Sequence, residues 1–92
     1  MIKLINRIPL SIIIVNYNSG IHIVECIYSI IRETEIIEYE VIVVDNDSTD
    51  DSIQCIKKTF PNIIVIENNR NRGFSAANNQ AIKISKGEMI LL

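Results

Sequence analysis

Polar side chains that could bind a ligand follow directly after the apolar run VIVV, in the segment DNDSTDDS. Asp45 and Asn46 come first, and a carboxylate or an amide there can accept hydrogen bonds from a base N–H or a ribose hydroxyl. We therefore expect these two residues to contact a ligand. A structural explanation suits Ser48, Asp50 and Asp51, because S-x-x-D forms a capping box and acidic residues complement a helix dipole.

Two other segments carry candidate ligand contacts. In VNYNSG, Tyr17 and Asn18 place an aromatic ring beside an amide, which suits a base and a phosphate, although Asn and Gly are equally typical of a plain turn. In NNRNRGFSAANN, Gly73 begins a predicted helix whose free N–H groups form an anion site, and a solvated helix start is the alternative. Asn78 and Asn79 are poor helix formers in that helix, which indicates a role in binding.

Apolar periodicity predicts that strands and helices alternate. The predicted strands cover residues 10–15, 39–45, 62–67 and 88–92. The predicted helices cover residues 21–32, the segment that ends at Pro61, and residues 74–86. Continuous apolar strands need helices on both faces, so we predict an α/β fold with a three-layer, doubly wound, mostly parallel sheet of Rossmann-like type in strand order 3-2-1-4. Ligands bind such sheets beyond the carboxyl ends of the strands, where the three polar segments should converge.

Composition and missing motifs exclude several classes of protein. The 92 residues carry a net charge of -2, which argues against binding nucleic acid through bulk charge. No apolar run approaches the ~20 residues of a transmembrane segment. Neither G-x-G-x-x-G nor G-x-x-x-x-G-K-[ST] occurs. The only histidine, His22, is expected to be a surface or capping residue at a helix start, which removes Ser-His-Asp and Cys-His chemistry. Cys26 and Cys55 are expected to be reduced core residues.

The motifs SIIIVNYNSG, YEVIVVDNDSTDDS, NRGFSAANNQAI and GEMILL, in this order and at these gaps, resemble the family 2 glycosyltransferases, and their pattern is similar to the rhamnosyltransferase-like branch. The resemblance covers residues 10–92 and implies the N-terminal half of a GT-A fold. The implied activity is the transfer of a sugar, with inversion, from a nucleoside-diphosphate-sugar of the UDP or dTDP type. The implied acceptor is a hydroxyl of a glycan or a lipid-linked molecule in polysaccharide biosynthesis.

Carried over onto matching positions, the resemblance implies donor-binding residues in all three polar segments. They are Val15, Tyr17, Asn18, Asp45, Asn46, Asn71, Gly73, Phe74, Asn78 and Asn79. Asn46 departs from the acidic pair of family members that use uridine donors, which leaves uridine and thymidine open. The Mg²⁺ or Mn²⁺ of the family is held by an Asp motif that would follow Leu92, and the general base lies further on. We therefore expect no metal and no catalytic residue within this chain.

These departures lead to an expectation for residues 1–92 as a whole. We expect residues 1–92 to form the N-terminal nucleotide-sugar-binding part of a GT-A domain, truncated in the fourth strand and inactive alone. The alternative is a non-catalytic remnant or interaction module with the same Rossmann-like nucleotide-binding fold. A receiver-like domain is disfavoured, because NYNSG contains no acidic residue. We expect a cytoplasmic location, with the inner face of the membrane as a candidate site for the full enzyme.

Overall fold

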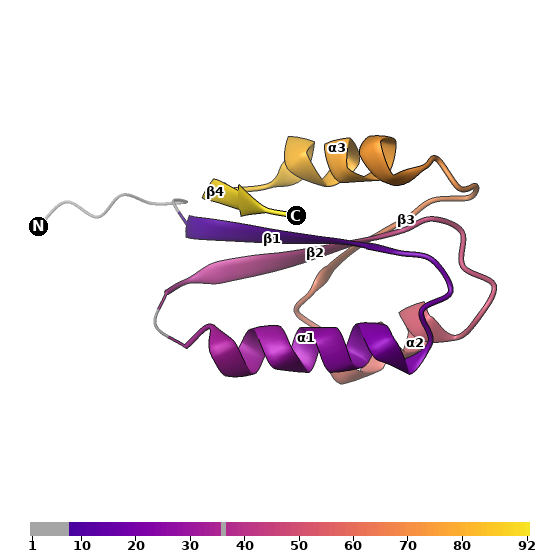
Figure 1. Ribbon diagram of the computed structural model, residues 1–92, viewed down its shortest axis with the longest axis horizontal. Helices are drawn as coiled ribbons and strands as arrows, with labels where there is room; N and C mark the ends of the chain where they lie inside the picture. The colour runs from indigo at the N-terminus through magenta and orange to yellow at the C-terminus, as the bar shows by residue number, and fades with distance from the viewer. Residues whose placement is uncertain (1–7, 36) are drawn as a thin grey trace, which may run out of the picture.

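Strands and helices alternate throughout the computed structural model, which describes residues 8–35 and 37–92. The elements are β1 (Ile8–Asn16), α1 (Ile21–Glu33), β2 (Tyr39–Asp45), α2 (Ser52–Thr59), β3 (Ile64–Glu67), α3 (Phe74–Ile84) and β4 (Gly87–Leu91). The strands form one parallel sheet in the order β3-β2-β1-β4. Helices α1 and α2 cover one face and α3 covers the other (Figure 1). The predicted three-layer α/β fold and its strand order are confirmed.

The central strands supply two apolar cores, because successive residues of a strand point to opposite faces of the sheet. The core on the α1 and α2 side contains Ile12, Ile23, Ile27, Val41, Val43, Ile53, Ile56 and Phe60. The core on the α3 side contains Ile13, Ile42, Val44, Ala77 and Ala81. Both faces of β2 are therefore covered, which explains why its sequence is continuously apolar instead of alternating.

The connections change sides of the sheet once along the chain. The crossovers from β1 to β2 and from β2 to β3 run through α1 and α2, whereas the crossover from β3 to β4 runs through α3 on the other face (Figure 1). Because β4 pairs with β1, the switch point lies between these two strands. The loops that leave β1, β2 and β3 all lie at the same end of the sheet, at the right of Figure 1.

Several local expectations differ from the structure. Helix α3 ends at Ile84 and not at residue 86, and β3 begins at Ile64 and not at residue 62. Cys26 and Cys55 are free thiols, but Cys26 is exposed, so its assignment to the core is wrong. The reason is the narrow buried stripe of α1, in which Ile23 and Ile27 face the sheet and leave Cys26 beside them.

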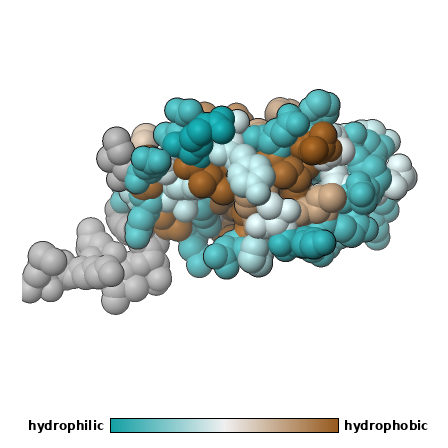
Figure 2. Space-filling model, turned by 90° about the horizontal axis from the view of Figure 1, so that it is seen from below, coloured by the Kyte–Doolittle hydropathy of each residue, from teal (hydrophilic) through white to brown (hydrophobic). Residues whose placement is uncertain are grey.

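Apolar side chains remain exposed on several elements. On β4, Met89 and Leu91 are exposed. On the face that carries α1 and α2, apolar side chains gather between hydrophilic ones (Figure 2). A cavity of about 490 Å³ lined by Tyr39, Phe60 and Ile63, among others, lies at the end of the sheet where β2 and β3 begin. Among the residues described, no helix has the length and apolar character needed to cross a membrane.

Candidate functional site

Three loops extend from the carboxyl ends of the strands and form one region, which we call the loop rim. The loop rim comprises residues 16–20, 45–51 and 68–73. The backbone ladder of the sheet continues into it, since the Asn46 N–H donates to the Asn16 carbonyl at 2.9 Å and the Asn68 N–H donates to the Asp45 carbonyl at 2.9 Å. These bonds fix where each loop leaves the sheet relative to its neighbour.

Asn16 and Asp45 form a buried polar centre beneath the first two loops. Asn16 is 1% exposed, and its Nδ2 donates to Asp45 Oδ1 at 2.9 Å and to Ser52 Oγ at 2.9 Å. The Asp45 carboxylate also accepts from the Ser48 N–H at 3.0 Å and from the Ser48 hydroxyl. A buried carboxylate is tolerated only when such donors surround it. Asp45 therefore organises the loop that follows β2.

Asn18 joins the loop after β1 to the loop after β2. Its backbone has φ +49°, a left-handed conformation that asparagine tolerates better than most residues. Its N–H donates to Ser48 Oγ at 2.9 Å, and its Oδ1 accepts from the backbone N–H groups of Thr49 at 2.7 Å and Asp50 at 3.3 Å. The Asn18 side chain thus accepts hydrogen bonds from backbone N–H groups of the second loop that would otherwise be solvated.

Asp50 takes the role that the sequence analysis gave to a capping box. Asp51 precedes α2 without a side-chain capping bond, and Ser48 is bonded to residues outside α2, so the predicted Ser48–Asp51 box is wrong. The Asp50 carboxylate instead accepts from the Ser52 N–H at 3.1 Å and from the Gly20 N–H at 2.9 Å. The hydrogen bond from the Ser52 hydroxyl is the main cause that lowers the pKa of Asp50 below its usual value of 3.8.

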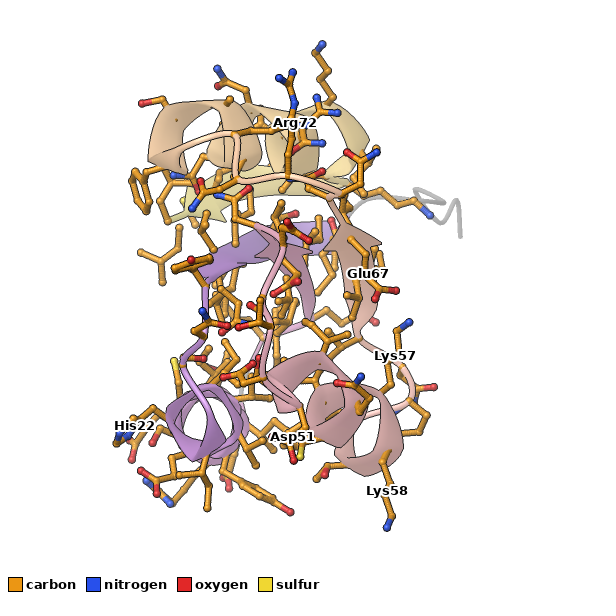
Figure 3. All side chains as sticks on the ribbon, turned by 90° about the vertical axis from the view of Figure 1, so that its right-hand side faces the viewer. His22, Asp51, Lys57, Lys58, Glu67 and Arg72 are labelled. Carbon is orange, nitrogen blue, oxygen red and sulfur yellow. The ribbon has the colours of Figure 1, made fainter. Side chains whose placement is uncertain are left out.

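Asn46 connects the end of β2 to the start of α3. Its Nδ2 donates to the Gly73 carbonyl at 3.1 Å, while its Oδ1 accepts from Asn68 Nδ2 at 3.0 Å and from the Arg72 N–H at 3.3 Å. Asn71 Oδ1 accepts from the Gly73 N–H at 2.8 Å. Figure 3, which looks onto the loop rim, shows Arg72 on the α3 side. The third loop is therefore attached to the end of the second strand.

The structure brings together part of the predicted donor-binding set. Hydrogen bonds tie five of its members into the loop rim, namely Asn18, Asp45, Asn46, Asn71 and Gly73. Most of these bonds run between the loops, so the loops hold one another in place.

The other predicted residues lie around the rim without such bonds. Val15 packs against the core on the α3 side, while Tyr17 and Phe74 have exposed rings, at 55% and 66% of their surface. Asn78 is 5% exposed and Asn79 is exposed.

The sequence analysis expects the segments that contain Tyr17, Asp45 and Asn78 to converge beyond the ends of the strands. Asp45 follows Val43 by two positions and bonds to Ser48 and Asn16 on the side of α1 and α2, whereas Asn78 belongs to α3 on the opposite face. Their approach to one ligand from the two faces of the sheet stays a prediction.

Sequence reasoning missed several residues of the rim. Asn16, Ser52, Asn68 and Gln80 all make hydrogen bonds there. The position of Asn16 and Asn68 in the sequence could have indicated them. Asn16 directly follows the apolar run that ends at Val15, and Asn68 directly follows Glu67 at the end of a predicted strand. Nothing local marked Ser52 and Gln80, which depend on contacts with other elements.

The described residues do not fit a divalent-metal site. Across residues 8–35 and 37–92 no group of three or more His, Cys, Asp or Glu side chains is placed to hold a metal ion. The carboxylates of Asp45 and Asp50 already accept hydrogen bonds from N–H and O–H donors. We therefore derive no metal-dependent step from these residues.

The fold and the rim define an α/β domain with hydrogen-bonded polar loops at the carboxyl end of its parallel sheet, and known proteins share this fold. Residues 11–92 match the family model described as glycosyl transferase family 2. The chain is 46% identical over 87 residues to a poly(ribitol-phosphate) beta-glucosyltransferase of Bacillus spizizenii, covering 89% of this chain and 14% of that protein.

Solved structures give the same result. TarS of S. aureus (residues 1–349) superimposes with a TM-score of 0.79 and 32% identity, over 89% of this chain and 26% of that chain. The mannosyltransferase PcManGT of Pyrobaculum calidifontis, solved in complex with GDP-Man and Mn²⁺, superimposes with a TM-score of 0.73 and 27% identity, over 91% of this chain and 26% of that chain.

The chain belongs to glycosyl transferase family 2. It spans only 14% of the poly(ribitol-phosphate) beta-glucosyltransferase and 26% of the TarS chain. The similarity therefore concerns the part of these proteins that corresponds to the sheet and rim described above.

Proposed function

We propose that this chain forms the donor-nucleotide-binding part of a glycosyltransferase. The protein that uses it transfers a sugar, with inversion, from a nucleoside-diphosphate-sugar to a hydroxyl of a glycan or lipid-linked acceptor. The observation that carries the proposal is the hydrogen-bonded loop rim, in which Asn18 joins the first two loops and Asn46 joins the second to the third. Such a rim lies where open α/β sheets bind their ligands.

The rim offers a different group to each part of a nucleoside diphosphate. The exposed ring of Tyr17, next to the end of β1, provides a surface on which a base can stack. The N-terminus of α3, preceded by Gly73, provides backbone N–H groups for the diphosphate. Arg70 and Arg72 are exposed just before that helix and add positive charge.

The donor base is proposed as uracil or thymine. Asn18 provides an exposed amide group, and an amide can donate to and accept from either base. The structure of PcManGT contains GDP-Man, so a guanine nucleotide belongs in any comparison of ligands. The Mg²⁺ or Mn²⁺ expected for the family has no fitting residues among those described, and we assign no catalytic residue here. We expect the isolated chain to bind donor nucleotides without transferring sugar.

Isothermal titration of the folded chain with UDP, dTDP and GDP tests the proposal. We expect millimolar or tighter binding of UDP or dTDP, with weaker binding of GDP. Circular dichroism before and after the titration verifies that the chain is folded. A folded chain that binds none of the three nucleotides would support the alternative, a remnant or interaction module of the same fold, and would remove the donor-binding role.

A further inference from the structure

We propose that Asn68 and Gln80 are positioning residues for the diphosphate of the donor. Their paired side-chain amides hold Asn46, and Asn46 holds the Arg72–Gly73 turn from which α3 begins. The inference rests on the proposed function, because it concerns how the same rim receives its nucleotide. Neither residue belongs to the set expected from the sequence.

The two amides form a closed pair. Asn68 Nδ2 donates to Gln80 Oε1 at 2.8 Å, and Gln80 Nε2 donates back to Asn68 Oδ1 at 2.8 Å. Asn68 is 8% exposed. Since each amide acts both as donor and as acceptor, the pair fixes the orientation of both planar groups. The loop between β3 and α3 is thus tied at its first residue to a position within the following helix.

The pair extends to the start of α3 through one further amide. Asn68 Nδ2 also donates to Asn46 Oδ1 at 3.0 Å, so both of its N–H groups are used. The same Asn46 oxygen accepts from the Arg72 N–H at 3.3 Å, and Asn46 Nδ2 donates to the Gly73 carbonyl at 3.1 Å. A continuous line of hydrogen bonds therefore runs from Gln80 to the residues that precede the first turn of α3.

This line determines which way the first N–H groups of α3 point. Gly73 has φ +82°, a conformation that glycine adopts readily and that the sequence alone does not enforce. Asn46 bonds to the Arg72 N–H and to the Gly73 carbonyl, which lie before and after the Arg72–Gly73 peptide, and these two bonds favour one conformation of the turn. Because the helix N-terminus binds the diphosphate in the proposed function, a displaced turn weakens phosphate binding before it affects the base.

Asn68 acts through its neighbours and does not contact the donor itself. It is buried, and its two N–H groups and its oxygen are bonded within the protein. A role in stability alone would also follow from such bonds, since a buried amide without partners destabilises the fold. The two roles predict different changes in affinity. A positioning role lowers the affinity for the nucleoside diphosphate alone, whereas a role in stability alone does not distinguish the diphosphate from the nucleoside.

The test compares Gln80→Met with the wild-type chain in NMR titrations of UDP and uridine, or of dTDP and thymidine if that base binds better. Methionine keeps the length of the side chain and removes both hydrogen bonds. Gln54→Met, at an exposed position of α2, is the matched control. We expect Gln80→Met to weaken diphosphate binding about tenfold, the equivalent of roughly one hydrogen bond, and to leave nucleoside binding unchanged.

Rescue separates positioning from general damage. The exchange Asn68→Gln with Gln80→Asn keeps an amide on each side, and we expect it to recover part of the diphosphate affinity. If Gln80→Met fails to fold, Gln80→Glu, which keeps one acceptor and removes the donor, carries the same comparison. Diphosphate affinity that is unchanged in the folded variant, or that falls equally with nucleoside affinity, overturns the inference while the proposed function stands. Absence of nucleotide binding by the wild type overturns both.

Discussion

Asn16 donates a hydrogen bond of 2.9 Å to Asp45 across the ends of two neighbouring strands, and both side chains are buried. The two residues are paired in the register of the parallel sheet. Their bond is the point where the sheet ends and the loop rim begins, so it couples the stability of the fold to the shape of the site.

Replacing Asn16 should reveal this coupling. Asn16→Ala removes a donor from the buried Asp45 carboxylate and leaves Ser52 Oγ without the same partner. We expect a loss of about 2 kcal/mol in the free energy of unfolding, measured by urea denaturation, because a buried charged group loses a hydrogen bond. Asn62→Ala, at an exposed position, should change the midpoint little. Equal midpoints for the two variants would contradict the assigned role of Asn16.

Asp50 should make the stability depend on pH in the acid range. Its folded-state pKa is lowered, chiefly by the hydrogen bond from the Ser52 hydroxyl, so the ionised form stabilises the fold. That contribution is present above the usual value of 3.8 and is lost as the pH falls through the lowered value. Thermal unfolding followed from pH 5 downward, over ~2–3 pH units, should show a smaller decrease for Asp50→Asn than for the wild type. Parallel curves for the two proteins would remove Asp50 as the cause.

Tyr17 should affect binding and not folding. Its ring is 55% exposed, so Tyr17→Ala is expected to leave the unfolding temperature nearly unchanged. Loss of a stacked base costs about 1–3 kcal/mol, which corresponds to roughly a 5- to 150-fold weaker affinity for the nucleotide. Tyr17→Phe should retain most of the affinity, since the ring remains.

A tyrosine on α1 offers the control for that measurement. Tyr28 packs edge-to-face on Phe60 with ring centroids 5.0 Å apart. Tyr28→Ala should therefore lower stability while the nucleotide affinity stays the same. If Tyr17→Ala and Tyr28→Ala change the nucleotide affinity equally, the proposal that the base stacks on Tyr17 is wrong.

Gly87 should tolerate no side chain. A Cβ at this position would lie 2.4 Å from Ser11 N and 2.5 Å from Ser11 Oγ, so β4 must shift away from β1. We expect Gly87→Ala to destabilise the chain by about 1–3 kcal/mol in denaturant unfolding. Lys83→Ala, on the exposed side of α3, should stay within about 0.5 kcal/mol of the wild type. A stable Gly87→Ala variant would mean that β4 lies further from Ser11.

The fold could be predicted from the sequence because its signals are local. Continuous apolar strands alternate with helical stripes, and only a doubly wound parallel sheet covers both faces of such strands. The errors arose where a residue's surroundings depend on a neighbouring element. Cys26 matched an apolar pattern but lies beside the stripe of α1 that faces the sheet. Ser48 matched a capping motif but bonds to Asp45 and Asn18.

The candidate site was less accessible to sequence reasoning. The segments of the loop rim were located correctly, since strand ends and turn residues are visible in the sequence. The partners within it were not, because the Asn16–Ser52 and Asn68–Gln80 bonds depend on the register of the strands and on where α2 and α3 lie against them. Residues of the predicted site thus divide into those that hold loops and those, such as Tyr17, that are exposed to solvent.

Strand β4 forms one edge of the described sheet, with Met89 63% and Leu91 55% exposed. An open edge that carries apolar side chains accepts strands from other molecules. We therefore expect concentrated preparations of the chain to self-associate, so nucleotide affinities should be measured in dilute samples.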